Sequence, residues 1–204
     1  MWSSVSSPAR DYALEALLVS MGIVALAEIG DKTQLLALIL AAKYRKPLPI
    51  VAGILAATLA NHAFAGALGL LAHSALRPGL LRWVLGLSFI AMAAWVLVPD
   101  RFEEGDAKLG RFGVFTTTLL TFFLAEMGDK TQLATVALAA QYHAFVAVVA
   151  GTTLGMLLAN VPVVFLGDRV GRRIPVKAVR GIAAALFLAL GLATLLGAAN
   201  SLGL

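Results

Sequence analysis

Four carboxylates and two lysines stand in two copies of one phrase, AEIGDKTQL at residues 27–35 and AEMGDKTQL at residues 125–133. The copies differ only at Ile29 and Met127, and each lies within a long apolar stretch. A charged side chain at the centre of a membrane-spanning helix costs about 2.5–3.5 kcal/mol on insertion scales. Ionisable residues at such positions therefore indicate a functional site, and clustered carboxylates predict chemistry with cations or protons.

Helical spacing predicts which of these side chains can meet. On a continuous helix Glu28 and Asp31 are three residues apart, so their carboxylates share a face, and Lys32 can reach back to Glu28. The second copy repeats this spacing with Glu126, Asp129 and Lys130. If the two copies converge near the membrane midplane, the site carries a net charge of −2 when every group is ionised. A divalent cation or two protons would neutralise it.

Further oxygen donors stand beside the acids. Hard cations such as Ca²⁺ and Mn²⁺ accept carboxylate, amide and hydroxyl oxygens. We therefore expect metal ligation by Glu28, Asp31, Glu126, Asp129, Gln34 and Gln132, with support from Lys32, Lys130, Thr33, Thr131, Asn61 and Asn160. The competing interpretation is that Glu–Lys pairs within each helix neutralise one another and only hold helices together.

The remaining polar residues of the apolar stretches give weaker signals. Asn61 and Asn160 stand at nearly equivalent places and could support the site or simply form hydrogen bonds between helices. His62 has no counterpart, so we expect a packed, hydrogen-bonded histidine. Met127 follows Glu126 directly, and adjacent residues on a helix point about 100° apart, so we do not expect it to ligate a metal.

A glycine separates Glu from Asp in each copy of the phrase. Gly30 and Gly128 either allow local unwinding, which would expose backbone carbonyls to an ion, or serve only close helix packing, as expected for Gly151 and Gly155.

Composition places the chain in a membrane. Hydrophobic residues make up 60% of the 204 and charged residues 13%, with a mean hydropathy of +0.91, which is outside the range of soluble domains of this size. Cysteine is absent, which excludes disulfides and thiolate ligands. The apolar segments predict six spans, at residues 13–42, 48–71, 82–98, 112–140, 145–166 and 179–199. The first and fourth have about 30 residues, more than a bilayer needs, which predicts tilt or a break.

The duplication extends beyond the phrase. At the same offset of 98 residues, Gly53 matches Gly151, Arg82 matches Arg180, and Phe89 matches Phe187. We therefore predict an all-α membrane protein of six transmembrane helices arranged as two three-helix repeats, residues 1–98 and 112–204, joined by a hinge at 99–111. Because three is odd, the repeats enter the membrane from opposite sides and have inverted topology.

The distribution of lysine and arginine predicts orientation. The loops after the first, third and fifth spans hold eleven of these residues, against Arg10, Arg77 and Arg82 on the other side. The positive-inside rule therefore places the 99–111 hinge in the cytoplasm and both termini outside it. The same short basic loops explain the pI of about 9.9 through contact with anionic lipid, without nucleic acid.

At these motifs the chain resembles the EGD-motif family of Golgi, chloroplast and bacterial manganese/calcium transporters, which carry two copies of E-x-G-D-K-S/T. The resemblance implies secondary transport of Mn²⁺ or Ca²⁺ out of the cytosol in exchange for protons. It matches Glu28, Asp31, Glu126 and Asp129 to the family's cation-binding acids. The short central loop looks like the bacterial form, for which manganese export across the inner membrane is implied, with no cofactor besides the transported ions.

Three other functions are a small-solute exporter, a passive cation channel and an intramembrane protease. Export of an amino acid or another small solute would need fewer acids and a larger pocket. A passive cation channel usually places acid rings at a pore mouth. An intramembrane protease lacks support because neither G-x-S-x-G nor G-x-G-D occurs. We therefore expect a transporter and not an enzyme, with its oligomeric state left open.

Overall fold

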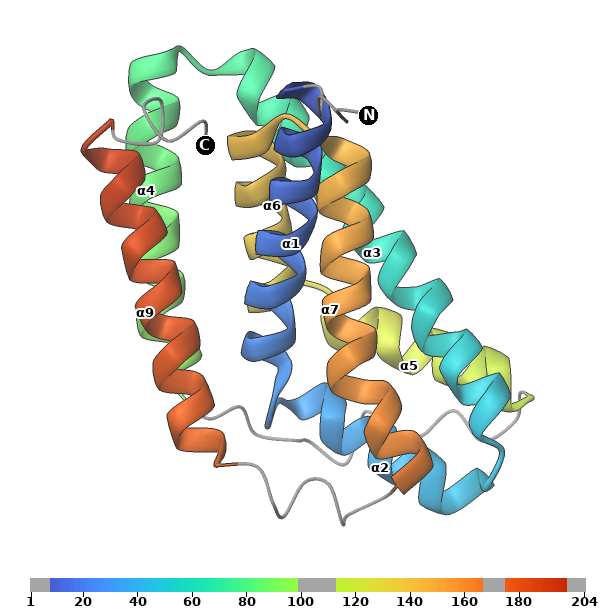
Figure 1. Cartoon of the computed structure of the whole chain (residues 1–204). Helices are drawn as coiled ribbons and strands as arrows, with labels where there is room; N and C mark the ends of the chain where they lie inside the picture. Colours follow the sequence, from blue (N-terminus) through green and yellow to red (C-terminus); the bar gives the residue numbers. More distant parts are fainter. Residues whose placement is uncertain (1–7, 99–112, 167–174, 198–204) are drawn as a thin grey trace, which may run out of the picture.

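The computed structural model describes residues 8–98, 113–166 and 175–197 (Figure 1). These residues form eight helices and no strand, which confirms the all-helical prediction for this part of the chain. The helices are α1 (Pro8–Glu28), α2 (Lys32–Tyr44), α3 (Pro47–Ala75), α4 (Pro78–Val96), α5 (Val114–Glu126), α6 (Lys130–Tyr142), α7 (Phe145–Leu166) and α9 (Val176–Leu195). The predicted hinge at 99–111 lies outside the described residues.

The lengths of the helices fit an integral membrane protein. Helices α3, α4, α7 and α9 are each long and apolar enough to cross a bilayer. Helices α1 and α2 pass the same test only together, as one span bent by 71° at a short break. Helix α5 is apolar but has only 13 residues. Of the two outcomes predicted for the long segments at 13–42 and 112–140, tilt or a break, the structure shows a break in each.

Each break is centred on the glycine of the repeated phrase. Gly30 has φ +77° and Gly128 has φ +75°, left-handed conformations that glycine adopts without the penalty of a Cβ atom. The next residue in each copy is extended, and it precedes the first turn of α2 or α6. The glycines therefore unwind the helix locally, which was one of the two roles predicted for them.

The two halves of the chain fold alike. Helices α2 and α6 both have 13 residues, and each is followed by a left-handed residue, Arg45 or His143, whose N–H donates to the carbonyl of Ala41 or Ala139. Helices α3 and α7 run in opposite directions, as do α4 and α9 (Figure 1). The 98-residue offset in the sequence thus extends to the backbone.

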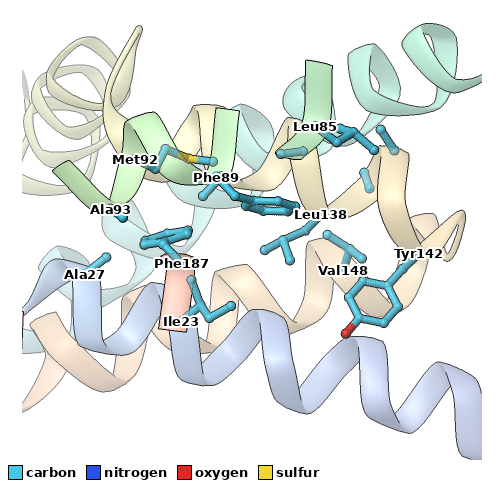
Figure 2. Packing of buried hydrophobic residues seen from close by; sticks show 14 of the residues in the cluster. Ile23, Ala27, Leu85, Phe89, Met92, Ala93, Leu138, Tyr142, Val148 and Phe187 are labelled. Atoms are coloured by element: carbon cyan, nitrogen blue, oxygen red, sulfur yellow. The ribbon is translucent and has the colours of Figure 1, made fainter. Parts of the chain in front are cut away.

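Two apolar clusters hold the helices together. The first joins α1, α4, α6, α7 and α9, and within it the rings of Phe89 and Phe187 stack with centroids 6.4 Å apart (Figure 2). The second joins α2, α3, α5 and α7 through residues such as Leu36, Ile54 and Phe122. Helices α4 and α9 therefore share a core with α1 and α6, whereas α2 and α5 pack mainly with α3 and α7.

Small residues allow close contact between α1 and α7. A Cβ atom on Gly155 would lie 2.5 Å from the Met21 carbonyl oxygen, and one on Gly151 would overlap the Leu17 carbonyl. The predicted packing role of these two glycines is confirmed.

Candidate functional site

The four acids of the repeated phrases flank the two breaks. Glu28 and Glu126 are the last residues of α1 and α5, and Asp31 and Asp129 stand just before α2 and α6. None of the four is more than 3% exposed. The prediction that Glu and Asp share one face of a continuous helix was wrong, because the left-handed glycine changes the chain direction between them.

The two phrases meet in space. Glu28, Glu126 and Asp129 each offer one carboxylate oxygen, and these three oxygens all lie within 4.8 Å of one another. Residues about 100 positions apart in the sequence therefore form one buried group of acids. Three carboxylate oxygens at this separation are suited to surround a single hard cation.

The lysines connect the repeats crosswise. Lys32 Nζ lies 3.1 Å from Asp129 Oδ1, and Lys130 Nζ donates to Asp31 Oδ1. The expected reach of each lysine to the glutamate of its own phrase was wrong, since the break separates Glu from Lys. The side chain of Lys130 is only 2% exposed and that of Lys32 is 23% exposed. Each aspartate is therefore neutralised by the other half of the molecule.

Threonine hydroxyls hold the glutamates in matching ways. Thr33 Oγ1 donates to Glu28 Oε2 at 2.6 Å, and Thr131 Oγ1 donates to Glu126 Oε2 at 3.0 Å. The second oxygen of each glutamate, and Asp129 Oδ2, are buried without a hydrogen-bond partner among the described residues. Buried carboxylate oxygens are costly unless a donor or a cation contacts them. These three oxygens are therefore the atoms best placed to receive a cation or a proton.

The predicted glutamine ligands contact the backbone instead. Gln34 Oε1 accepts the N–H of Gly30 at 3.0 Å, and Gln132 Oε1 accepts that of Gly128 at 2.7 Å. Gln34 Nε2 also donates to the Ala159 carbonyl of α7. The unwound backbone leaves these N–H groups without helical partners, and the glutamines satisfy them. In this structure both glutamines stabilise the breaks.

The two asparagines and His62 have different hydrogen-bond partners. Asn61 Nδ2 donates to the Phe123 carbonyl near the end of α5, while Asn160 bonds to Met156 within its own helix. His62 is fully buried, with Nδ1 3.5 Å from the hydroxyl of Thr153, in line with the packed histidine expected there. Met127 is 53% exposed. The Asn61 side chain therefore joins α3 to one of the broken spans.

One contact at the site was not predicted. Arg180 Nη2 of α9 donates to the carbonyl of Gly30 at 2.7 Å. The sequence marked Arg180 only as a positive charge and as the repeat partner of Arg82. The contact joins residues 150 positions apart, so it depends on how α9 packs against α1.

Comparison with known proteins identifies a family and several relatives. The family described as "Divalent cation/proton antiporter GDT1" matches residues 16–104 and again residues 114–202. A Vibrio cholerae protein described as "Putative manganese exporter" is 49% identical over 196 residues, which cover 95% of this chain and 98% of that protein.

More distant relatives come from photosynthetic organisms. A GDT1-like protein of Synechocystis is 29% identical and covers 85% of this chain and 93% of its own length. GDT1-like protein 3 of Oryza sativa subsp. indica is 27% identical and covers 85% of this chain and 71% of its own length. No solved structure is significantly similar to the chain. The two family matches span both copies of the acidic phrase, and the chain belongs to the GDT1 family of divalent cation/proton antiporters.

Proposed function

We propose that this protein exports Mn²⁺ from the cytosol across the bacterial inner membrane in exchange for protons. The observation that carries the proposal is the convergence of Glu28, Glu126 and Asp129, from both repeats, on one buried point. The Vibrio relative described as a manganese exporter supports the choice of cation. Carboxylate oxygens also suit Ca²⁺, which we propose as a second, weaker cargo.

The membrane topology forms part of this proposal. Each broken pair, α1 with α2 and α5 with α6, would be one span, which gives six spans in two inverted repeats. The repeats are residues 1–98 and 112–204, with the hinge at 99–111 in the cytoplasm and both termini outside. Support comes from the matched break at each glycine and from the opposite directions of α4 and α9 (Figure 1).

Within the site the acids have different tasks. Glu28, Glu126 and Asp129 would ligate the cation through the oxygens that lack hydrogen-bond partners among the described residues. Asp31, held by Lys130, would complete the charge balance. Thr33 and Thr131 would orient the glutamates, and a further ligand would be a backbone carbonyl of the break.

Charge balance supports exchange with protons. Four carboxylates against two lysines leave a net charge of −2 when all are ionised, and the buried site strongly disfavours that charge without an ion. Two protons would neutralise the site after the cation leaves. Metal and protons would then compete for the same oxygens, and each turnover would move one divalent cation against about two protons.

Flux measurements in proteoliposomes test the proposal. Outward Mn²⁺ flux should accelerate when an imposed pH gradient makes the receiving side acidic. Glu28→Gln, Glu126→Gln and Asp129→Asn should each reduce flux to background, while Glu15→Gln, which changes an acid of α1 outside the cluster, should keep it. Flux that follows the membrane potential alone would indicate a channel. Flux of amino acids without Mn²⁺ transport would identify a solute exporter.

A further inference from the structure

Helix α9 closes over the first break and leaves the second uncovered. Arg180 donates to the Gly30 carbonyl, and the side chain of Val176, one turn earlier, fills the space where a Cβ of Gly30 would stand. The Gly30 carbonyl lies in the unwound segment after α1, and Arg180 donates a hydrogen bond to it there. The first turns of α9 therefore form a polar and an apolar contact with the unwound glycine.

The equivalent contacts of the second repeat are not made. The residues that correspond to Arg180 and Val176 are Arg82 and Pro78 at the start of α4. Arg82 is exposed and lies beside Gly197 at the end of α9. No atom of the described residues lies within 4 Å of a Cβ built on Gly128, and Gly128 is exposed. The two breaks have nearly the same sequence, and their glycines have nearly the same φ, but their neighbours differ.

The α4–α9 helix pair as a whole shows the same asymmetry. Helices α4 and α9 pack on each other through Phe89 and Phe187 and share an apolar cluster with α1 and α6. In the repeats, α1 corresponds to α5, and α6 corresponds to α2. If the two repeats exchanged their roles, the α4–α9 pair would therefore pack on α5 and α2. The cluster formed here around α2 and α5 consists instead of residues from α2, α3, α5 and α7. The arrangement described here therefore differs from the one that exchange of the two repeats would give.

We propose that Arg180 and Arg82 are alternating latches of the transport cycle. In the state described here, Arg180 holds Gly30 and α9 covers the first break. In the opposite state the α4–α9 pair moves against the broken spans, Arg180 releases Gly30, and Arg82 holds the carbonyl of Gly128. This inference rests on the proposed transport function and its inverted repeats, and it identifies two positioning residues for that function.

Electrostatics couples the latch to the cargo. Glu28 ends α1 two residues before Gly30, so the guanidinium of Arg180 and a cation among the acids would repel each other. Cation binding would therefore weaken the Arg180 latch. A variant that lacks the Arg180 side chain should therefore shift the equilibrium away from the state described here and toward the opposite state.

Engineered disulfides can detect both states, because the chain has no native cysteine. A Cβ on Gly30 would lie 3.4 Å from Val176 Cβ, close to the spacing of about 3.5–4.5 Å in disulfides. The test pair is Gly30→Cys with Val176→Cys, and its matched mirror is Gly128→Cys with Pro78→Cys. Both pairs place cysteine at a left-handed glycine, so the backbone strain is the same in each.

The cross-linking yields should respond to the arginines in opposite directions. Arg180→Ala should raise the yield of the mirror pair by about threefold or more and lower that of the first pair, and Arg82→Ala should do the reverse. The proposal is overturned if the mirror pair never exceeds its single-cysteine controls, or if Arg180→Ala lowers both pairs. Cross-linking needs neither cargo nor a gradient, so its result is independent of whether Mn²⁺ is the substrate.

Transport gives a second test without cysteines. Arg82 lies away from the acids in this structure, so a purely structural role predicts normal flux for Arg82→Ala. The latch predicts that Arg82→Ala and Arg180→Ala each reduce Mn²⁺ flux about tenfold or more while equilibrium Mn²⁺ affinity changes less than about threefold. Arg180→Lys, which keeps the charge, should recover part of the flux. Wild-type flux in Arg82→Ala would contradict the proposal.

Discussion

Among its single residues, the site combines two features. Some buried carboxylate oxygens have no hydrogen-bond partner among the described residues, and two ion pairs join the acid of one repeat to the lysine of the other. Asp31 and Asp129 are each held by the lysine of the other repeat, whereas the glutamates are held by threonines of their own phrase. In the proposed function, the glutamates exchange one cation for protons. The aspartates connect the two repeats at the site.

The two lysines should differ in importance for stability. Lys130 is almost fully buried with Asp31, and removing one partner of a buried pair costs about 3–5 kcal/mol because the other charge remains. Lys32 is 23% exposed, so water can screen the Asp129 charge when the lysine is absent, and its loss should cost less. Lys130→Met should therefore lower the melting temperature in detergent far more than Lys32→Met.

A double variant separates charge from packing in this experiment. If the uncompensated carboxylate causes the loss, adding Asp31→Asn to Lys130→Met should recover part of the melting temperature. Equal losses in the two single variants, or no recovery in the double variant, would contradict the unequal burial of the pairs.

The acids could be predicted from the sequence, and their partners could not. A repeated acidic phrase in apolar sequence is costly without a function, so Glu28, Asp31, Glu126 and Asp129 are recognisable as site residues. Helical spacing assigned Lys32 to Glu28 because it assumed an unbroken helix. The left-handed conformation of Gly30 separates Lys32 from Glu28, and the Gln34 side chain accepts a hydrogen bond from the Gly30 N–H at the break.

At the scale of elements, the broken spans bring the acids together. Each break ends one helix at a glutamate and starts the next after an aspartate, so both side chains lie at helix ends near unwound backbone. The sequence showed that the spans at 13–42 and 112–140 were longer than necessary. It did not show the 71° bend between α1 and α2, which depends on packing with α3 and α7.

The two breaks should tolerate alanine unequally. Gly30→Ala and Gly128→Ala both introduce a Cβ at positive φ, which costs on the order of 1 kcal/mol. Among the described residues, the Cβ at position 30 overlaps Val176, whereas that at position 128 meets no atom, so Gly30→Ala should reduce thermal stability and flux more than Gly128→Ala.

Shortening the neighbour should restore part of that difference. Val176→Ala removes the methyl groups that a Cβ at position 30 would meet, so the double variant should behave more like Gly128→Ala. If Val176→Ala gives no recovery, the contact between α9 and the first break is not what distinguishes the two glycines.

The connection between α6 and α7 should make stability depend on pH. His143 lies there with its ring centroid 3.4 Å from that of His73, and burial together with His73 lowers the pKa of His143. A folded-state pKa below the unfolded value of about 6.5 means that the folded state binds fewer protons, so this contribution is lost as pH falls below that value. Asparagine at 143 tolerates the left-handed backbone and does not titrate.

Thermal unfolding at two pH values measures this effect. The melting temperature of the wild-type protein should fall between about pH 7.5 and pH 5.5, and that of His143→Asn should fall less. The same decrease in both proteins would show that His143 does not contribute to the pH dependence.

In the whole molecule, the two repeats are the basis of the proposed cycle between two equivalent arrangements. The offset of 98 residues was visible in the sequence and recurs in the helix bounds and in both breaks. Which of the two arrangements the α4–α9 pair adopts could not be predicted, because exchanging the repeats leaves the pattern unchanged.

Orientation can be tested with single cysteines, since none is native. The excess of lysine and arginine on one side predicts that an impermeant thiol reagent, added to intact cells, labels a cysteine near Gly197 and leaves one in the 99–111 hinge unlabelled. Labelling of the hinge without labelling at Gly197 would reverse the orientation.

In the proposed function, the acids of both repeats form one site in which a divalent cation and protons compete. This competition can be measured as proton release on Mn²⁺ binding to the purified protein, in weakly buffered detergent solution near neutral pH. We predict release of about two protons for each Mn²⁺ bound, and loss of both binding and release in Glu28→Gln and Glu126→Gln alike. Mn²⁺ binding without proton release, or normal binding in either variant, would contradict a single shared site.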